Sequence, residues 1–169
     1  MCPGGAVIAG ASGPDQVVTN GMSRKARDGI NANAAVVVQI NPEDMPPGPL
    51  GGVAFCEELE KRAFLAGGGT GHAPASTVGD FLSGKKPRSL GDVAATYRPG
   101  VLPCDLWDVL PALVAQGVAD GLRAFSRQLV GFDLPDAVLT AVESRTSAPY
   151  RILRGENGQS VTASGLYPA

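Results

Sequence analysis

Residues 137–154, AVLTAVESRTSAPYRILR, combine an apolar strand with a polar end. The run 138–142 predicts a buried strand, because it is rich in aliphatic and β-branched residues. Glu143 and Arg145 follow, and on an extended chain two residues at this spacing point to the same side. Such a charged pair can hold the polar edge of a ligand. The alternative is a surface strand whose two charges are solvated.

Two hydroxyl residues, Thr146 and Ser147, come next and run into Pro149. Proline restricts the preceding backbone, so this segment is expected to be extended or turned. Both hydroxyls can donate hydrogen bonds to a carbonyl of a ligand.

The composition limits the classes of function and partner that are expected for the chain. The chain has 169 residues and a mass of 17.2 kDa, enough for one domain with a hydrophobic core. The formal charge of −2 and the scattered basic residues argue against a nucleic-acid partner. The 23 glycines and 14 prolines predict many loops and short elements. No apolar run approaches the roughly 18 residues of a membrane span, so no membrane partner is expected.

The three cysteines, Cys2, Cys56 and Cys104, are far apart in the sequence. An odd number without close spacing does not indicate a disulfide framework. With His72 as the single histidine, the pattern does not fit a zinc site, and no metal is expected. A reducing, cytoplasmic location is the default expectation. Cys2 stands in a Cys-Pro-Gly-Gly turn, where it is either a structural residue or a redox-active thiol.

Short strands with two main helices predict the fold class α+β. Residues 6–9 and 17–19 are expected to pair as a hairpin, and residues 22–29 to form an irregular loop. The β-branched run 34–40, AAVVVQI, is the strongest predicted strand and is long enough to be central in a sheet. Further strands are expected at 138–142, 151–153 and 160–163.

The two main helices are expected at 53–66 and 111–128. Gly117 and Gly121 each weaken the second helix by about 1 kcal/mol relative to Ala, so tertiary packing has to stabilise it. Shorter helices are expected at 77–82 and 106–110. The apolar face of the first main helix contains Cys56, Leu59, Ala63 and Phe64.

The glycine run 67–72, GGGTGH, has the composition of a phosphate-binding loop but not its pattern. A dinucleotide fingerprint needs G-x-G-x-x-G directly after a strand and at the start of a helix. Here His72 occupies the third glycine position, and the run follows a predicted helix. The run is therefore expected to terminate that helix.

Six runs of sequence occur in an order that points to one family. They are MCPGG (1–5), TNGMS (19–23), ARDG (26–29) with NAN (31–33), VGDFL (78–82), ESRTSAP (143–149) and GLYPA (165–169). Together they resemble the FAD-utilising dehydrogenase family, FAD-dependent oxidoreductases related to the two-dinucleotide-fold flavoproteins. The resemblance covers nearly the whole chain.

The resemblance implies that this chain is a central part of a flavoenzyme. Family members are longer, and their G-x-G-x-x-G segment holds the FAD pyrophosphate at a helix N-terminus. Residues 1–137 would then belong to an inserted substrate-side domain, and residues 138–169 would return towards the FAD-binding domain. That remaining domain and an unidentified small-molecule substrate are the implied partners. FAD binding by residues 1–169 alone is expected to be weak or absent.

The resemblance also implies candidate site residues. Flavin performs the hydride chemistry, while the protein orients it and sets the electrostatics. Candidates for a catalytic role are Cys2, Arg145 and Ser147; the planar guanidinium of Arg145 suits a carboxylate or phosphate. Candidates for cofactor binding are Asn20, Gly21, Arg145, Thr146, Ser147, Gly165 and Tyr167. Asn31 and Asn33 offer further amides.

Two other functions stay open from the sequence. One is an independent, non-catalytic binding or lid module, because the phosphate-binding loop is missing from these residues. The other is a redox protein based on Cys2, although no resolving cysteine lies near it in the sequence.

Overall fold

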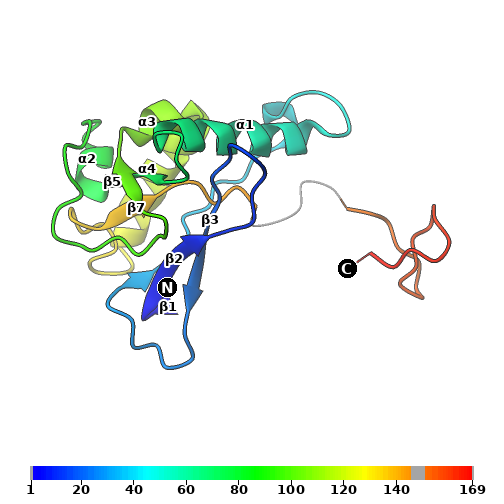
Figure 1. The fold of residues 1–169 in the computed structure, drawn as a ribbon, viewed down its shortest axis with the longest axis horizontal. Helices are drawn as coiled ribbons and strands as arrows, with labels where there is room; N and C mark the ends of the chain where they lie inside the picture. The colour runs from blue at the N-terminus through cyan, green and yellow to red at the C-terminus, as the bar shows by residue number, and fades with distance from the viewer. Residues whose placement is uncertain (1, 146–150, 169) are drawn as a thin grey trace.

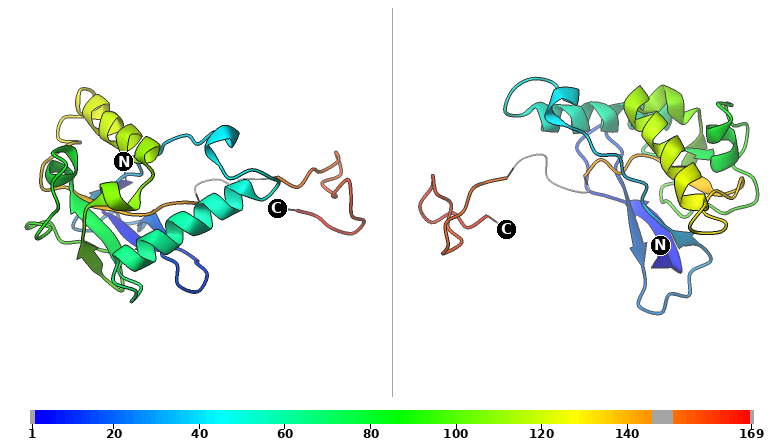
Figure 2. Two further views of the ribbon diagram at one scale, coloured as in Figure 1. Left: turned by 90° about the horizontal axis from the view of Figure 1, so that it is seen from above. Right: turned by 180° about the vertical axis from the view of Figure 1, so that it is seen from behind.

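The computed structural model describes residues 2–145 and 151–168 and has an α+β fold, which confirms the predicted class (Figure 1). Residues 2–145 form the body of the molecule. Residues 151–168 form a looped tail that stands apart from the body (Figures 1 and 2). The candidates Thr146 and Ser147 lie outside the described residues.

A mixed three-stranded sheet lies in the body, and its middle strand is β5 (Ala73–Thr77). The flanking strand β6 (Val101–Pro103) is parallel to β5, and β7 (Val138–Thr140) is antiparallel to it. Every residue of β5 is buried. The strand β7 confirms the greater part of the predicted strand 138–142, and Ala141 and Val142 continue as buried residues beyond it.

The sequence did not reveal β5, although it is the central strand. Its residues, APAST, are small, and Pro74 argues against a central strand because proline has no N–H to donate. The structure tolerates Pro74 because its carbonyl still accepts a hydrogen bond from the Ala141 amide at 3.0 Å. Small side chains also let neighbouring helices pack closely against the strand, so tertiary packing overrides the weak local preference.

A second region contains two small antiparallel pairs. The hairpin joins β2 (Gly5–Ala9) to β3 (Thr19–Ser23), and β1 (Cys2–Pro3) pairs with β4 (Ala32–Asn33). The predicted hairpin is thus confirmed for its first strand, but its second strand is displaced towards the C-terminus. Met22 and Ser23 belong to it and not to a loop.

The displacement has a physical cause in the buried residues Val17 and Val18. The Val17 amide donates to the Glu60 carbonyl at 3.2 Å, and the Thr19 amide donates to the Val142 carbonyl at 2.8 Å. These bonds hold Val17 and Val18 in the core, where their apolar side chains are removed from water. The ladder with β2 therefore starts at Thr19, which pairs with Ala9.

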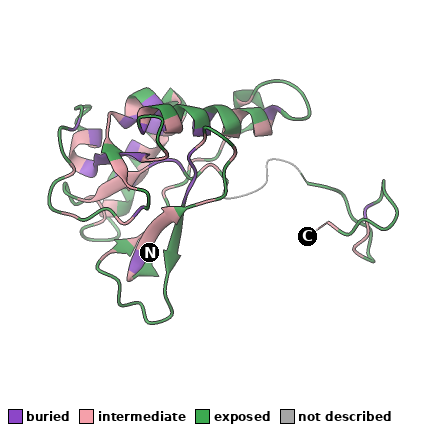
Figure 3. Cartoon of the chain, in the orientation of Figure 1, coloured by how far each residue is buried: buried purple, intermediate pink, exposed green. Residues whose placement is uncertain are grey.

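The two main helices are confirmed as α1 (Gly51–Ala66) and α4 (Ala112–Ser126). Their buried residues form one core with β5 and with the short helices α2 (Val78–Leu82) and α3 (Leu106–Val109) (Figure 3). A 3₁₀ helix, η1 (Pro42–Asp44), precedes α1. The run 67–72 terminates α1, as predicted, and Gly68, Gly69 and Gly71 adopt positive φ angles that favour glycine.

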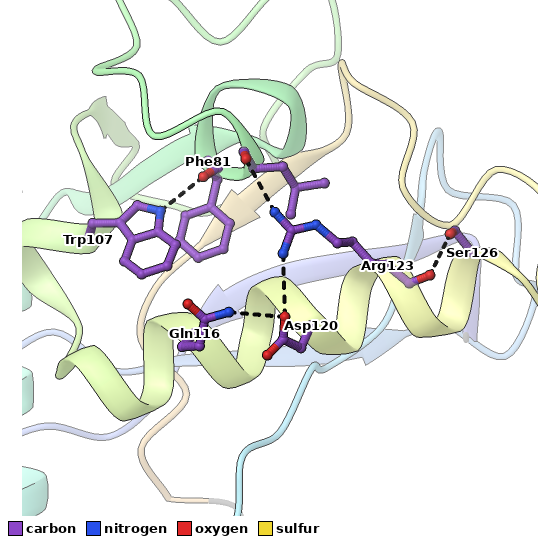
Figure 4. A network of polar contacts seen from close by, with 7 residues as sticks. Phe81, Trp107, Gln116, Asp120, Arg123 and Ser126 are labelled. Atoms are coloured by element: carbon purple, nitrogen blue, oxygen red, sulfur yellow. Dashed lines mark hydrogen bonds and ion pairs between the residues drawn. The ribbon is translucent and has the colours of Figure 1, made fainter.

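Helices α2, α3 and α4 are joined by aromatic and polar contacts (Figure 4). The rings of Phe81 and Trp107 stack with centroids 5.3 Å apart, and the Trp107 indole N–H donates to the Phe81 carbonyl at 2.9 Å. Arg123 of α4 reaches the Leu82 carbonyl at 3.4 Å and also contacts Asp120. These contacts fix the short helices against α4.

The predicted strand 34–40 was wrong. Within residues 2–145 and 151–168, this segment exchanges no backbone–backbone hydrogen bond, and only β4 just before it is a strand. Its side chains instead pack on α4, where Val38 lies against Gly117 and Val36 against Gly121. The composition favours an extended backbone, but a strand also needs a neighbouring strand to pair with.

The predicted strands 151–153 and 160–163 were also wrong. An isolated bridge joins Arg154 to Ser160, and the Val161 amide donates to the Leu153 carbonyl at 3.1 Å. The turn between them brings the two segments together, but two short segments alone form too few bonds for a stable ladder.

The two glycines of α4 give a matched pair of substitutions. A Cβ on Gly121 would lie 3.5 Å from Val36 Cγ1, an ordinary contact, so Gly121→Ala is expected to stabilise the protein by up to about 1 kcal/mol. A Cβ on Gly117 would lie 2.8 Å from Val38 Cγ2, so Gly117→Ala is expected to destabilise by about 1–3 kcal/mol. Urea unfolding measures both, and equal effects would contradict the close packing of residues 34–40 on α4.

Candidate functional site

A cleft of about 1250 Å³ opens beside the core. Its walls include the extended segment 34–40, residues 137–144, and side chains of α1 and α4. Aliphatic and aromatic side chains dominate the lining. The volume exceeds the range of roughly 300–1000 Å³ that is usual for a site holding one small ligand.

Polar residues that the sequence singled out line this cleft together. Asn20 and Gly21 come from β3, and Asn31 and Asn33 come from the chain around β4. The Asn31 side chain donates to the Ala94 carbonyl at 2.8 Å. The exposed side chain of Asn20 makes no hydrogen bond with the described residues, so its amide is available to a ligand.

Asn33 is seated closely on the hairpin. Its Nδ2 donates to the Ala6 carbonyl at 3.1 Å, while its Oδ1 is buried without a hydrogen-bond partner among the described residues. A Cβ on Gly21 would lie 2.7 Å from Nδ2, and a Cβ on Gly5 would collide with Oδ1. Glycine at both positions therefore makes room for the Asn33 side chain. The role of Gly21 seen in the structure is to provide this space.

Arg145 is bonded to a carboxylate that the sequence reading missed. Its Nε and Nη2 donate to the two carboxylate oxygens of Glu60 at 2.8 and 2.6 Å, and Ser144 Oγ donates to Glu60 Oε1 at 2.6 Å. The Glu60 side chain is 0% exposed, whereas the Arg145 side chain is 47% exposed. These hydrogen bonds raise the pKa of Arg145. The planar fork assigned to a ligand thus holds Glu60.

The position of Glu60 in the sequence indicates that its carboxylate is buried. It lies four residues after Cys56 and three before Ala63, so it occupies the middle of the predicted apolar face of the helix. A carboxylate on such a face requires a buried partner. The partner could not be identified, because it lies 85 residues away in the chain.

The remaining candidates lie elsewhere. Cys2 is exposed on β1 and does not line the cleft. Gly165 and Tyr167 lie in the tail, where the Tyr167 hydroxyl is 3.3 Å from the Gln159 side-chain oxygen. Glu143 and Ser144 line the cleft, whereas the neighbouring Arg145 is not part of the lining.

The charge of the lining limits what can bind. Among the described residues, the charged ones that line the cleft are Asp136 and Glu143, and none of these lining residues is a lysine or arginine. Within the described part of the chain, no group of three or more His, Cys, Asp or Glu side chains is placed to hold a metal ion. The same part contains no helix that is both long and apolar enough to cross a membrane.

The cysteines differ in their environment. Cys56 lines the cleft, and its thiol donates to the Ser144 carbonyl at 3.4 Å. Burial, together with the charge of Glu60, raises the pKa of Cys56. Burial also raises the pKa of Cys104 to about 11. Both thiols are therefore expected to be poor nucleophiles near neutral pH.

Removing Arg145 and removing the charge of Glu60 are expected to lower the free energy of unfolding by different amounts. Arg145→Ala leaves a buried carboxylate without its counter-charge and is expected to cost about 3–5 kcal/mol. Glu60→Gln leaves a half-exposed guanidinium that water can solvate, and it is expected to cost less, about 1–3 kcal/mol. Urea unfolding measures both. Glu58→Ala, which breaks the exposed Glu58–Arg62 pair of the same helix, is the control and should stay within about 0.5 kcal/mol. A larger loss for Glu60→Gln than for Arg145→Ala would refute the assignment.

Alkylation tests the order of thiol reactivity. At pH 8 a thiol of pKa about 11 is ionised to roughly one part in a thousand, so Cys104 is expected to react at least ten times more slowly than exposed Cys2. Iodoacetamide labelling followed by peptide mass spectrometry gives both rates. Comparable rates for Cys2 and Cys104 would show that the burial of Cys104 is wrong.

Comparison with known proteins places the chain in a family. Residues 1–146 match the family model described as FAD-dependent protein, C-terminal domain-like. An uncharacterized protein of Clostridium beijerinckii is 42% identical over 169 residues, which is 99% of this chain and 32% of that protein. The chain therefore spans about a third of the length of this relative. Because the family model covers most of the residues, the chain belongs to the FAD-dependent protein, C-terminal domain-like family.

Proposed function

We propose that residues 1–169 form part of a longer FAD-dependent oxidoreductase and supply the substrate-side wall of its flavin pocket. The observation that carries this proposal is the open cleft, which combines apolar walls with the amides of Asn20, Asn31 and Asn33. The family to which the chain belongs is an FAD-dependent one. When bound, the flavin would supply the hydride chemistry.

The lining of the cleft matches the isoalloxazine ring of FAD but not its pyrophosphate. An isoalloxazine ring is flat and largely apolar, with carbonyl and N–H groups along one edge, so apolar walls and amide side chains match it. The pyrophosphate carries negative charge and is usually held at a helix N-terminus or by cations. The lining has no lysine or arginine and contains the carboxylates Asp136 and Glu143. The pyrophosphate is therefore assigned to protein outside residues 1–169.

Each residue of the site then has a defined task. The Asn20 amide, free of other described partners, binds a polar edge of the ring or of a substrate by donating and accepting. The aliphatic walls exclude water from the reacting face. Glu60 accepts hydrogen bonds from both Arg145 and Ser144, and so fixes Ser144, which lines the cleft.

The expected result in the longer protein that contains these residues is bound flavin, measured by its visible absorbance. Asn20→Ala removes one hydrogen bond worth about 1 kcal/mol, so the dissociation constant for flavin is expected to rise about fivefold. Asn41→Ala is the matched control, since Asn41 lies outside the lining of the cleft. Residues 1–169 alone are expected to bind FAD weakly or not at all in a fluorescence titration.

Three outcomes would contradict the proposal. Absence of flavin from the longer protein would favour the independent binding or lid module. Submicromolar FAD binding by residues 1–169 alone would show that the pyrophosphate site lies within them. An Asn20→Ala variant with unchanged flavin affinity and unchanged flavin spectrum would remove the cleft from the flavin pocket.

A further inference from the structure

We infer that residues 34–40, which form no strand within the described residues, become a β-strand when they pair with a strand from a part of the longer polypeptide outside residues 1–169. The inference rests on the proposed function in one respect, because both require the longer polypeptide. It does not require bound flavin. The segment is the most strand-like run of the sequence, yet it has no backbone partner among the described residues. Seven extended residues whose N–H and C=O groups have no backbone partner in the described part of the chain form a template of roughly 23 Å for strand addition.

The side chains of the segment alternate as in a half-buried strand. Val36, Val38 and Ile40 are half-buried, and the first two pack on α4. Ala35, Val37 and Gln39 between them are exposed. Val37 is 63% exposed, which is unfavourable for a large β-branched side chain unless a partner covers it. One face is thus already packed on α4, and a strand paired along the backbone edge would place its own side chains beside the exposed ones, Val37 among them.

A second segment that lines the same cleft is also an open edge. Strand β7 is the last strand of the sheet ordered β6-β5-β7, so one of its sides is unpaired within the described residues. Both β7 and residues 34–40 line the cleft. A cleft lined by an extended segment without a partner among the described residues and by a strand with one open side is suited to an inserted strand, which would form backbone hydrogen bonds and bury the apolar walls.

The size of the cleft and the length of the relative favour a partner from the same polypeptide. The cleft of about 1250 Å³ is larger than one small ligand requires. The Clostridium beijerinckii relative has two further thirds of chain that residues 1–169 do not match. The inserted strand is expected to place an aliphatic side chain opposite Val37, because cross-strand apolar pairs stabilise a sheet.

Hydrogen exchange compares residues 1–169 with the longer relative. In this chain the amides of 34–40 are expected to exchange at nearly unprotected rates, while amides of β2 and β3 are protected. In the relative, the aligned segment is expected to be protected at least a hundredfold more, with or without bound flavin. Protection without flavin would support the strand partner even if the proposed flavin function failed.

Other results would overturn the inference. An unprotected segment in the relative would leave it without a partner there. Protection in this chain as a monomer would mean that the partner lies within residues 1–169. Protection that appears together with a dimer in analytical ultracentrifugation would identify a second copy as the partner.

A substitution tests the free backbone of the segment in this chain. Val37→Pro removes the N–H of residue 37, and Val37→Ala removes side-chain atoms without touching the backbone. Since this N–H has no partner among the described residues, both variants are expected to have the same urea midpoint. A clearly lower midpoint for Val37→Pro would show that the N–H is already paired and would overturn the inference.

Discussion

The buried carboxylate of Glu60 is the constraint on which the arrangement of the body depends. Its two oxygens accept hydrogen bonds from Arg145 and Ser144, and its backbone carbonyl accepts from the Val17 amide. A single residue of α1 therefore connects the helix to the chain after β7 and to the entry of β3. A carboxylate without exposure is stable only while these partners remain, which restricts how the three segments can be placed.

This constraint also shapes the cleft. By holding Ser144 and Arg145 against α1, Glu60 fixes the end of the wall formed by residues 137–144. The opposite wall is fixed in another way, by Val36 and Val38 packed on the glycines of α4. One wall is held by charge and the other by close packing of small residues. Between them lies an open surface that favours an apolar ligand or polypeptide.

Parts of the fold followed from local sequence. The periodic apolar residues of α1 and α4 predicted both helices within two residues at each end, because amphipathic helices carry their pattern in themselves. The amides at the strand ends, Asn20, Asn31 and Asn33, were also identified from the sequence, and they meet at the cleft. By contrast, the short, small-residue strand β5 escaped prediction, since its stability comes from neighbours distant in the chain.

The sequence by itself determined the fold class, the two main helices, and the resemblance to FAD-dependent proteins, since composition, periodicity and motif order are properties of neighbouring residues. Only the tertiary structure decided that the fork of Arg145 binds Glu60, and that residues 34–40 are extended without a ladder. Both outcomes depend on which distant groups meet. A guanidinium binds the carboxylate that packing brings to it, and a β-branched run becomes a strand only where another strand lies beside it.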